Sequence, residues 1–438
     1  HRKLRDTIEW SYRMLPPPVA AVFEQLCVFA GGFTIPAAES VCRLQDNAEM
    51  DLLDGIEALL DASLVRRADA MGGIDRFEML QTIREYGLER LAEDGRGEMV
   101  RRRHALHFLE QAEVAEPGFR GPDIGHYLGG LHVEHDNLRA ALTWALQADE
   151  GDVALRLAAA LWRFWHLHGD LASGRRWVER ALALPSASAH TRSRAKALLA
   201  AGSLAYWQLD DGAMAARYEE AAATFEELGD EAATAHARYN VAFGLGIRGR
   251  LEEAIEMLRS CQAVFEKLGD RRAFADSLFG LAIMYRLGGD LEMARETGEE
   301  ALAIHRELGD LFGLIGSLYV VGRVATQLGD LETGRALFME TLGIEEAFGE
   351  RTGIALSLDN LADLEIDDGD PVRAMRLGGA AEVIKEGVGG QAPPDLITLS
   401  DPRERVRPML SEEETEGAWQ EGRRMSLEQA IAYAREKA

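Results

Sequence analysis

Small and apolar positions recur every forty residues through the second half of the chain, between polar stretches, and predict a series of paired helices. The phrase FEELGD at 225–230 returns as FEKLGD at 265–270, as HRELGD at 305–310 and as EEAFGE at 345–350. In each phrase a glycine can end one helix, and the acidic residue after it can cap the next. Each forty-residue unit is therefore predicted to be two antiparallel helices.

A second set of joints lies between these phrases. Its glycines are Gly249, Gly289, Gly329 and Gly369, with Gly169 two periods earlier. Its acidic residues are Asp170, Asp210, Asp290, Asp330 and Asp370. Leu209 is the exception, because it stands where the pattern expects a glycine.

Small residues occupy the positions where neighbouring helices must approach closely. Seven residues before the second joints stand Gly202, Ala242, Ala282, Gly322 and Ala362. Five residues after them stand Ala254, Ala294, Gly334 and Ala374, and seven further on come Ala221, Cys261, Ala301, Thr341 and Ala381. Cys261 is thus expected to be a buried packing residue and not a reactive thiol.

The first hundred residues follow a different pattern. Helices are predicted at 3–14, 18–29, 35–44 and 49–61, followed by a hairpin over 64–79 with its turn at Gly72 and Gly73, and then by a further helix. Helices with a two-stranded wing are typical of a winged helix. Winged helices often bind DNA, but the third of the three helices that would make up the winged helix is acidic here. Its acidic residues are Glu49, Asp51, Asp54, Glu57 and Asp61, against Arg66, Arg67 and Arg76 on the wing.

Composition and charge narrow the functional classes. The 438 residues are 47% hydrophobic and carry a formal net charge of −26, so most of the surface repels phosphate backbones. We expect no direct nucleic-acid binding, and no membrane insertion, because no apolar run approaches the ~20 residues of a membrane helix. Three cysteines, Cys27, Cys42 and Cys261, favour reduced thiols in a cytoplasm.

No constellation of catalytic residues is evident. The chain has no Walker A loop and no G-x-S-x-G motif. His132 and His135 lie one turn apart, but without a nearby cysteine they are read as part of an amphipathic helix and not as metal ligands. We therefore expect neither an enzyme nor a metal site.

The small residue, the Gly turn and the Ala of the second helix resemble the tetratricopeptide repeat over residues 151–390, in roughly six helix pairs. The period is longer than the usual ~34 residues, and HEAT or armadillo repeats also run to ~40 or more. The resemblance implies a curved α-solenoid with a concave groove.

Longer phrases resemble the STAND-type, NB-ARC-like ATPase transcription regulators of the LuxR or AfsR kind. They are RKLRDTIEWSYRML, VFAGGFTIPAAESVC, FEMLQTIREYGLERLAE, EHDNLRAALTWAL and WRFWHLHGDLASGRRWVERAL. The resemblance implies a fragment that begins just after the ATPase, so ATP or ADP would bind a missing upstream domain and no cofactor is expected here. Met79–Leu80–Gln81 matches the family's Met-His-Asp triplet but lacks its histidine. The end of the chain resembles the segment before a LuxR-type helix-turn-helix.

These observations predict a mostly α protein in four parts. They are a winged-helix domain at 1–96, a helical connector with the first helix pair at 97–186, a tetratricopeptide solenoid at 187–390, and a C-terminal linker with helices at 391–438. The predicted function is a non-catalytic, cytoplasmic sensing region of a transcription regulator. Its partners would be the neighbouring ATPase domain and a protein, peptide or small-molecule inducer. The alternative is a free-standing interaction scaffold.

The first helix of each pair should line the groove of such a solenoid. The positions ten, six and three residues before each joint then face inward. At these positions the central repeats carry aromatic rings and two arginines, which commonly anchor binding surfaces. The predicted ligand- or partner-binding residues are Tyr206, Tyr239, Phe243, Phe279, Arg286, Tyr319 and Arg323. The arginines favour a ligand with an anionic group. The open alternative is that the rings pack between helices and the arginines pair with nearby acids.

Overall fold

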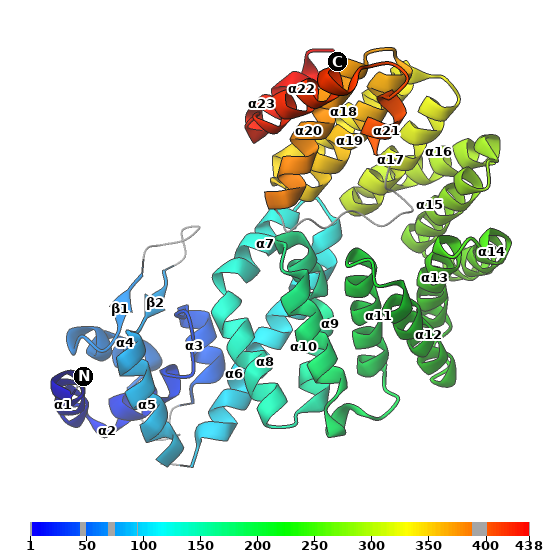
Figure 1. Ribbon diagram of the computed structural model, residues 1–438. Helices are drawn as coiled ribbons and strands as arrows, with labels where there is room; N and C mark the ends of the chain where they lie inside the picture. Colours follow the sequence, from blue (N-terminus) through cyan, green and yellow to red (C-terminus); the bar gives the residue numbers. More distant parts are fainter. Residues whose placement is uncertain (1, 44–49, 69–74, 94, 388–400, 438) are drawn as a thin grey trace. The chain divides into compact units, whose positions relative to one another are not determined.

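The computed structural model describes residues 2–43, 50–68, 75–93, 95–387 and 401–437. It is almost entirely helical (Figure 1). The chain divides into two compact units. The first unit contains residues 1–116, 126–161 and 180–188, and the second contains 117–125, 162–179 and 189–438.

The first unit holds the N-terminal helices and the two strands. Its helices are α1 (Arg2–Arg13), α2 (Pro17–Leu26), α3 (Ile35–Val41), α4 (Leu52–Asp61), α5 (Gln81–Glu93), α6 (Gly97–Ala115), most of α7 (Ile124–Val133), α8 (His135–Gln147) and the first part of α9 (Gly151–His168). Two of the predicted helices, α2 and α3, end three residues earlier than expected. The break at Glu134 separates α7 from α8, where one continuous helix was expected.

The strands of the predicted hairpin are confirmed. β1 (Arg66–Arg67) pairs antiparallel with β2 (Phe77–Glu78), with Arg66 opposite Glu78. Phe33 joins β2 through an isolated bridge to Phe77. The predicted turn residues Gly72 and Gly73, and Glu49 of the acidic helix, lie outside the described residues. The term winged helix remains an interpretation of this arrangement.

Arg76, expected on the surface of the wing, points inward instead. Its side chain is buried, donates to the carbonyl oxygen of Gly31 at 3.0 Å and forms an ion pair with Glu134. Asn137 completes the connection by donating to the Gly32 carbonyl at 2.9 Å and accepting from Ala30 N–H at 2.7 Å. Arg76 therefore holds the strands against the start of α8. Its guanidinium group is not exposed on the surface, where it could contact a DNA phosphate.

The second unit confirms the predicted helix pairs, which follow one another along the chain (Figure 1). Its repeat helices are the end of α9 with α10 (Leu171–Leu182), α11 (Arg192–Trp207), α12 (Asp211–Glu227), α13 (Glu231–Ile247), α14 (Leu251–Leu268), α15 (Arg271–Leu287), α16 (Leu291–Leu308), α17 (Leu311–Gln327), α18 (Leu331–Phe348), α19 (Arg351–Asp367) and α20 (Pro371–Gly387). A short 3₁₀ turn, η1 (Glu116–Arg120), leads from the first unit into residues 117–125 of the second, and another, η2 (Pro185–Ala187), belongs to the first unit.

The joints have the predicted chemistry. Gly269 ends α14 in the left-handed conformation with φ 69°, and Asp270 caps α15 by accepting from Ala273 N–H at 3.0 Å. The small packing positions are buried too. A side chain at Gly322 would place its Cβ 2.6 Å from the ring of Phe338, so only glycine fits there. Cys261 is buried, and burial raises the pKa of its thiol to about 11.

Leu209 is the joint at which the pattern lacks a glycine, and its backbone adopts the left-handed conformation all the same, with φ 58°. A branched side chain in this region costs on the order of 1 kcal/mol. We expect Leu209→Gly to raise the free energy of unfolding by about 1 kcal/mol, measured by urea denaturation. The reciprocal variant Gly249→Leu, at a joint with φ 73° and open space around it, should lose a similar amount. A destabilised Leu209→Gly variant would contradict this account.

A group of short helices, named here the C-terminal cap, packs on the last repeat. It consists of α21 (Pro402–Val406), α22 (Glu412–Arg423) and α23 (Leu427–Arg435). Trp419 is buried against Gly378 of α20, and its indole N–H donates to Glu382 at 3.0 Å. Arg405 of α21 forms ion pairs with Asp363 and Asp367 of α19. The cap thereby covers apolar surface of α20 that a further repeat would otherwise cover.

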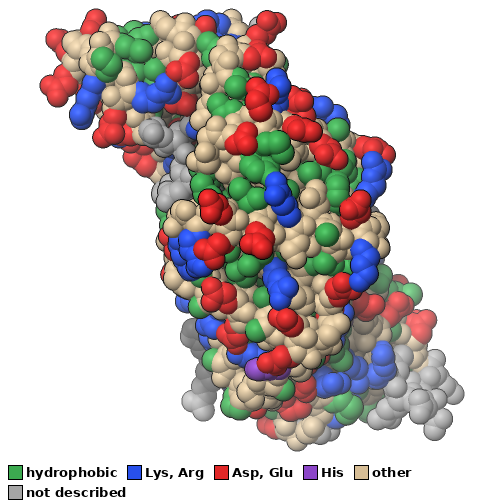
Figure 2. Space-filling model, turned by 90° about the vertical axis from the view of Figure 1, so that its right-hand side faces the viewer, with side chains coloured by type: hydrophobic (Ala, Val, Ile, Leu, Met, Phe, Trp, Pro, Cys, Tyr) green, Lys and Arg blue, Asp and Glu red, His purple; other side chains and the backbone are tan. Residues whose placement is uncertain are grey.

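Ion pairs on the exposed side of the helices join the two helices of one pair and also helices of successive pairs. They include Lys267–Glu231 at 2.8 Å, Arg271–Glu307 at 2.6 Å and Arg306–Glu340 at 2.7 Å. Figure 2 accordingly shows acidic and basic side chains next to one another over one face. Among the described helices, none is long and apolar enough to cross a bilayer.

Candidate functional site

Four of the predicted site residues form a continuous chain of ring contacts across three repeats. This aromatic chain consists of Tyr206 on α11, Tyr239 and Phe243 on α13, and Phe279 on α15. The ring of Phe243 lies 6.5 Å from Tyr206, 5.1 Å from Tyr239 and 6.4 Å from Phe279. All four side chains are half-buried, so the chain is neither fully core nor fully surface.

The aromatic chain continues towards the first helix pair through two residues, Trp207 and His166, that were not among the predicted site residues. Trp207 follows Tyr206, and the imidazole of His166 on α9 stacks on its indole with ring centres 4.1 Å apart. Burial lowers the pKa of His166 to about 3, helped by the nearby charge of Arg163. His166 is therefore neutral near pH 7 and acts as a further flat ring.

Both predicted arginines are half-buried, and the pKa of each lies below the ordinary value for arginine. Burial lowers the pKa of Arg286 to about 10, and the charge of Arg323 adds to that effect. Burial likewise lowers the pKa of Arg323, although Asp363 opposes this. Arg323 donates to the Asn360 side chain at 3.4 Å. Two desolvated guanidinium groups of like charge would be stabilised by an anion between or beside them.

Arg286 also lines an open pocket at the α15–α16 and α17–α18 joints. The pocket has a volume of about 730 Å³. The other residues that line it are Gly289, Leu291, Thr326, Gln327, Gly329, Leu331 and Asp367. An anionic ligand could reach Arg286 from this side.

Tyr319 does not belong to the aromatic chain. It is buried, and its ring contact is with Phe338 at 6.5 Å. Its hydroxyl donates to the Glu345 carboxyl at 2.7 Å, and the Gly353 carbonyl oxygen lies 3.1 Å away. Ser357 also donates to Glu345, at 2.7 Å. Tyr319 thus contributes to a polar network inside the last repeats, because Glu345 and Ser357 draw its hydroxyl inward.

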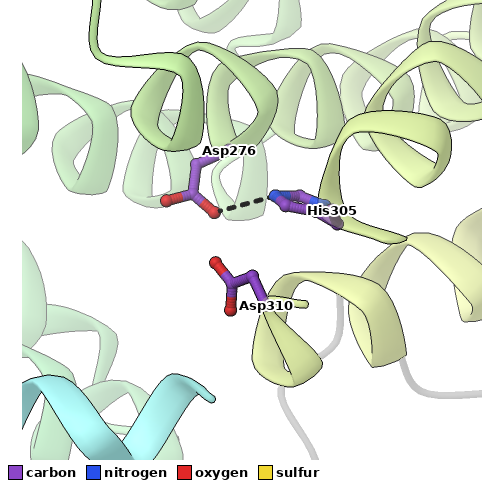
Figure 3. A group of neighbouring side chains, drawn as sticks. All are labelled: Asp276, His305 and Asp310. Carbon is purple, nitrogen blue, oxygen red and sulfur yellow. Dashed lines mark ion pairs between the residues drawn. The ribbon is translucent and has the colours of Figure 1, made fainter. Parts of the chain in front are cut away.

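An acidic cluster in the central repeats was not predicted. It consists of Asp276 on α15, His305 on α16 and Asp310 at the start of α17 (Figure 3). Their potential ligand atoms all lie within 4.8 Å of one another, and the His305 Nε2 atom lies 3.4 Å from Asp276. His305 and Asp310 have fully buried side chains, and that of Asp276 is 15% exposed.

Arg120 occupies the space at which the cluster points. Its guanidinium donates to Asp276 at 2.7 Å and to Asp310 at 3.0 Å. Burial alone would lower the pKa of Arg120, but the two carboxylates raise it above its ordinary value, and Arg120 in turn holds the pKa of Asp276 below its ordinary value. Arg272 lies 3.3 Å from Asp310 on the other side. Two carboxylates therefore face two guanidinium groups, and a metal ion would have to displace Arg120.

The aromatic chain and the acidic cluster are electrostatically coupled. Burial raises the pKa of Tyr239 well above its ordinary value, and the charge of Asp276 contributes. Asp276 lies one helical turn before Phe279, which is one of the predicted groove-facing positions. Extending the set of groove-facing positions by one turn would therefore have included Asp276. Arg120 gave no comparable signal, because it lies in the aperiodic stretch EPGFRGPD.

Comparison with known proteins finds a family match within the repeats and relatives that are similar over about half of the chain. Residues 230–307 match the sequence model of the tetratricopeptide repeat family. A protein of Mycobacterium bovis, whose name proposes an HTH-type transcriptional regulator, is 30% identical over 241 residues, which cover 53% of this chain and 27% of that protein. A Mycobacterium tuberculosis protein matches to the same extent. The chain thus spans about a quarter of the length of these curated relatives.

Two solved structures share the fold. A Signal Transduction ATPase with Numerous Domains (STAND) protein with a tetratricopeptide repeat sensor, from Pyrococcus horikoshii, aligns with a TM-score of 0.55 and 14% identity over 97% of this chain and 63% of that one. A Rap protein complexed with competence and sporulation factor aligns with a TM-score of 0.50 and 14% identity over 80% and 97% of the two chains. The protein is therefore built around a tetratricopeptide-like helical solenoid.

Proposed function

We propose that this chain is the sensing region of a STAND-type transcription regulator, in which the repeat arm binds a ligand or partner and sets the state of a neighbouring ATPase domain. The coarser part, a regulatory region of tetratricopeptide repeats, is supported by the relative named as a regulator and by the structural neighbour with a repeat sensor. The winged helix, the LuxR-like context and a cytoplasmic location belong to the proposal.

The observations that carry the proposal are the aromatic chain and the two half-buried arginines, Arg286 and Arg323, on helices of the same central repeats. Half-buried rings present flat apolar surface at little entropic cost, and arginine adds directional charge. Arg286 and Arg323 are partly desolvated already, so an anion gains strong hydrogen bonds there without much further loss of hydration. We therefore assign the site to a peptide or small molecule that carries a carboxylate or phosphate group next to an apolar portion.

The test is a selection of short random peptides on the immobilised protein, followed by calorimetry with the selected peptides. We expect peptides with acidic or C-terminal carboxylate groups, and a loss of about tenfold or more in affinity for Arg286→Ala and for Arg323→Ala, because a charge-assisted hydrogen bond contributes about 1.5–3 kcal/mol.

Arg295→Ala is the matched control, because it removes a cation that pairs with Glu292 on the exposed side of α16. Its affinity should equal that of the wild-type chain. Selection of no peptide, or equal binding by the Arg286→Ala, Arg323→Ala double variant, would refute the site.

A further inference from the structure

Arg120 reaches the repeats from a segment far away in the sequence. Residues 117–125 belong to the second unit, whereas the chain on both sides of them belongs to the first. Within the segment Phe119 is buried and the Arg120 side chain is 18% exposed, while Pro122 and Asp123 are exposed. The segment contacts the repeats through the arginine held by Asp276 and Asp310.

The surroundings of the two carboxylates suit a guanidinium group. Asp276 and Asp310 come from two successive repeats and share the Arg120 fork: Asp310 accepts from Nε at 3.0 Å and lies 2.7 Å from Nη2, and Asp276 accepts from Nη2 at 2.7 Å. A single point charge could not satisfy both carboxylates equally well. The ring of Phe312 lies 5.4 Å from the Arg120 guanidinium and 4.3 Å from that of Arg163. Such stacking on an aromatic face favours arginine over lysine.

The carboxylates keep other partners when Arg120 is absent. Asp310 caps α17 by accepting from Gly313 N–H at 3.2 Å, and Arg272 lies beside it. Asp276 keeps its contact with His305 and is partly accessible to water. Departure of Arg120 therefore leaves no isolated buried charge, which would otherwise cost several kcal/mol. The arginine can leave without unfolding the repeats.

We propose that Asp276 and Asp310 form an arginine-binding site on the repeat arm, that the chain fills this site with its own Arg120, and that an arginine side chain of a partner protein competes with Arg120 for it. Segment 117–125 is then an internal occupant of the arm. Binding of the partner releases the segment, and occupation by Arg120 keeps the partner out. This site is separate from Arg286 and Arg323, so either proposal can fail while the other holds.

The first test uses trypsin on the folded chain, followed by mass spectrometry of the bond between Arg120 and Gly121. In the wild-type chain the paired Arg120 should be protected. Asp276→Asn with Asp310→Asn should increase cleavage at this bond about tenfold or more relative to other arginines, while asparagine still caps α17. The control Asp290→Asn changes a capping residue of α16 that forms no ion pair with an arginine among the described residues, and it should leave the rate unchanged. Equal cleavage in all three proteins would overturn the proposal.

The second test uses a fluorescent peptide of sequence EPGFRGPD, which copies residues 116–123. It should bind the Arg120→Ala chain, and bind the wild-type chain at least tenfold more weakly, because the site there is filled. The same peptide with alanine in place of arginine should not bind either chain. Equal binding to both chains, no binding to the variant, or uptake of Zn²⁺ by the variant in place of the peptide would overturn the proposal.

Discussion

Replacing Gly422 by alanine should lower the free energy of unfolding by about 2–3 kcal/mol, because it forces apart two helices whose backbones touch. A Cβ atom at Gly422 on α22 would lie 2.0 Å from the carbonyl oxygen of Arg376 on α20. The same constraint holds in the other direction: a Cβ atom added at Gly379 on α20 would lie 2.2 Å from the carbonyl oxygen of Trp419 on α22. Neither backbone can yield locally, so the C-terminal cap must move away from the last repeat.

Thermal and urea denaturation measure this loss, and limited proteolysis should show earlier release of residues 402–437. Gly417→Ala is the matched control, since it lies on the same helix with nothing within 4 Å of the added Cβ. That variant should be neutral or more stable by up to about 1 kcal/mol through helix propensity. Equal stability of Gly422→Ala and Gly417→Ala would show that the cap does not depend on this close approach.

Replacing Glu345 by glutamine should remove a pH dependence of stability on the order of 5 kcal/mol. Burial raises the pKa of Glu345 to about 8, against an ordinary value of 4.5, although hydrogen bonds from Tyr319 and Ser357 oppose the shift. Between these two values the folded state holds a proton that the unfolded state has released. This contribution to stability is therefore fully present below pH 4.5 and lost as the pH rises to about 8.

Glutamine has the shape and hydrogen-bonding capacity of the protonated acid, so Glu345→Gln should retain its stability as the pH rises from 5 to 8 while the wild type falls behind. Urea denaturation at several pH values measures the difference. Glu300→Gln, on the exposed side of α16, serves as the control and should follow the wild-type profile. Parallel profiles for wild type and Glu345→Gln would mean that the buried carboxyl does not titrate in this range.

Much of the fold could be predicted because it depends on local chemistry. A glycine that needs a positive φ and an aspartate that caps a helix are short-range requirements, and they repeat every forty residues. Even Leu209, which lacks the glycine, keeps the left-handed backbone because the repeat around it demands the turn. The docking of the C-terminal cap could not be predicted, since Gly378 and Gly379 of the last repeat and Gly422 of α22 serve a contact with a segment that lies outside the periodic pattern.

The candidate site was predictable only in part. The inward-facing rows brought Tyr206, Tyr239, Phe243 and Phe279 together because helix periodicity alone determines which residues share a face. The same rows placed Tyr319 with them, but its position depends on a buried glutamate on another helix. Arg120 pairs with residues 156 and 190 positions later in the chain, and nothing in its own neighbourhood specifies them.

This separation also determines when the arginine contact can form during folding. The helix pairs close short loops with their neighbours, and such local contacts require little loop-closure entropy. Arg120 must instead close a loop of 190 residues to reach Asp310, and Asp276 and Asp310 are brought together only when α15 and α17 have already packed. The segment around Arg120 is therefore added to finished repeats. A chain that reaches this last step late exposes an assembled but unoccupied arginine site while it folds.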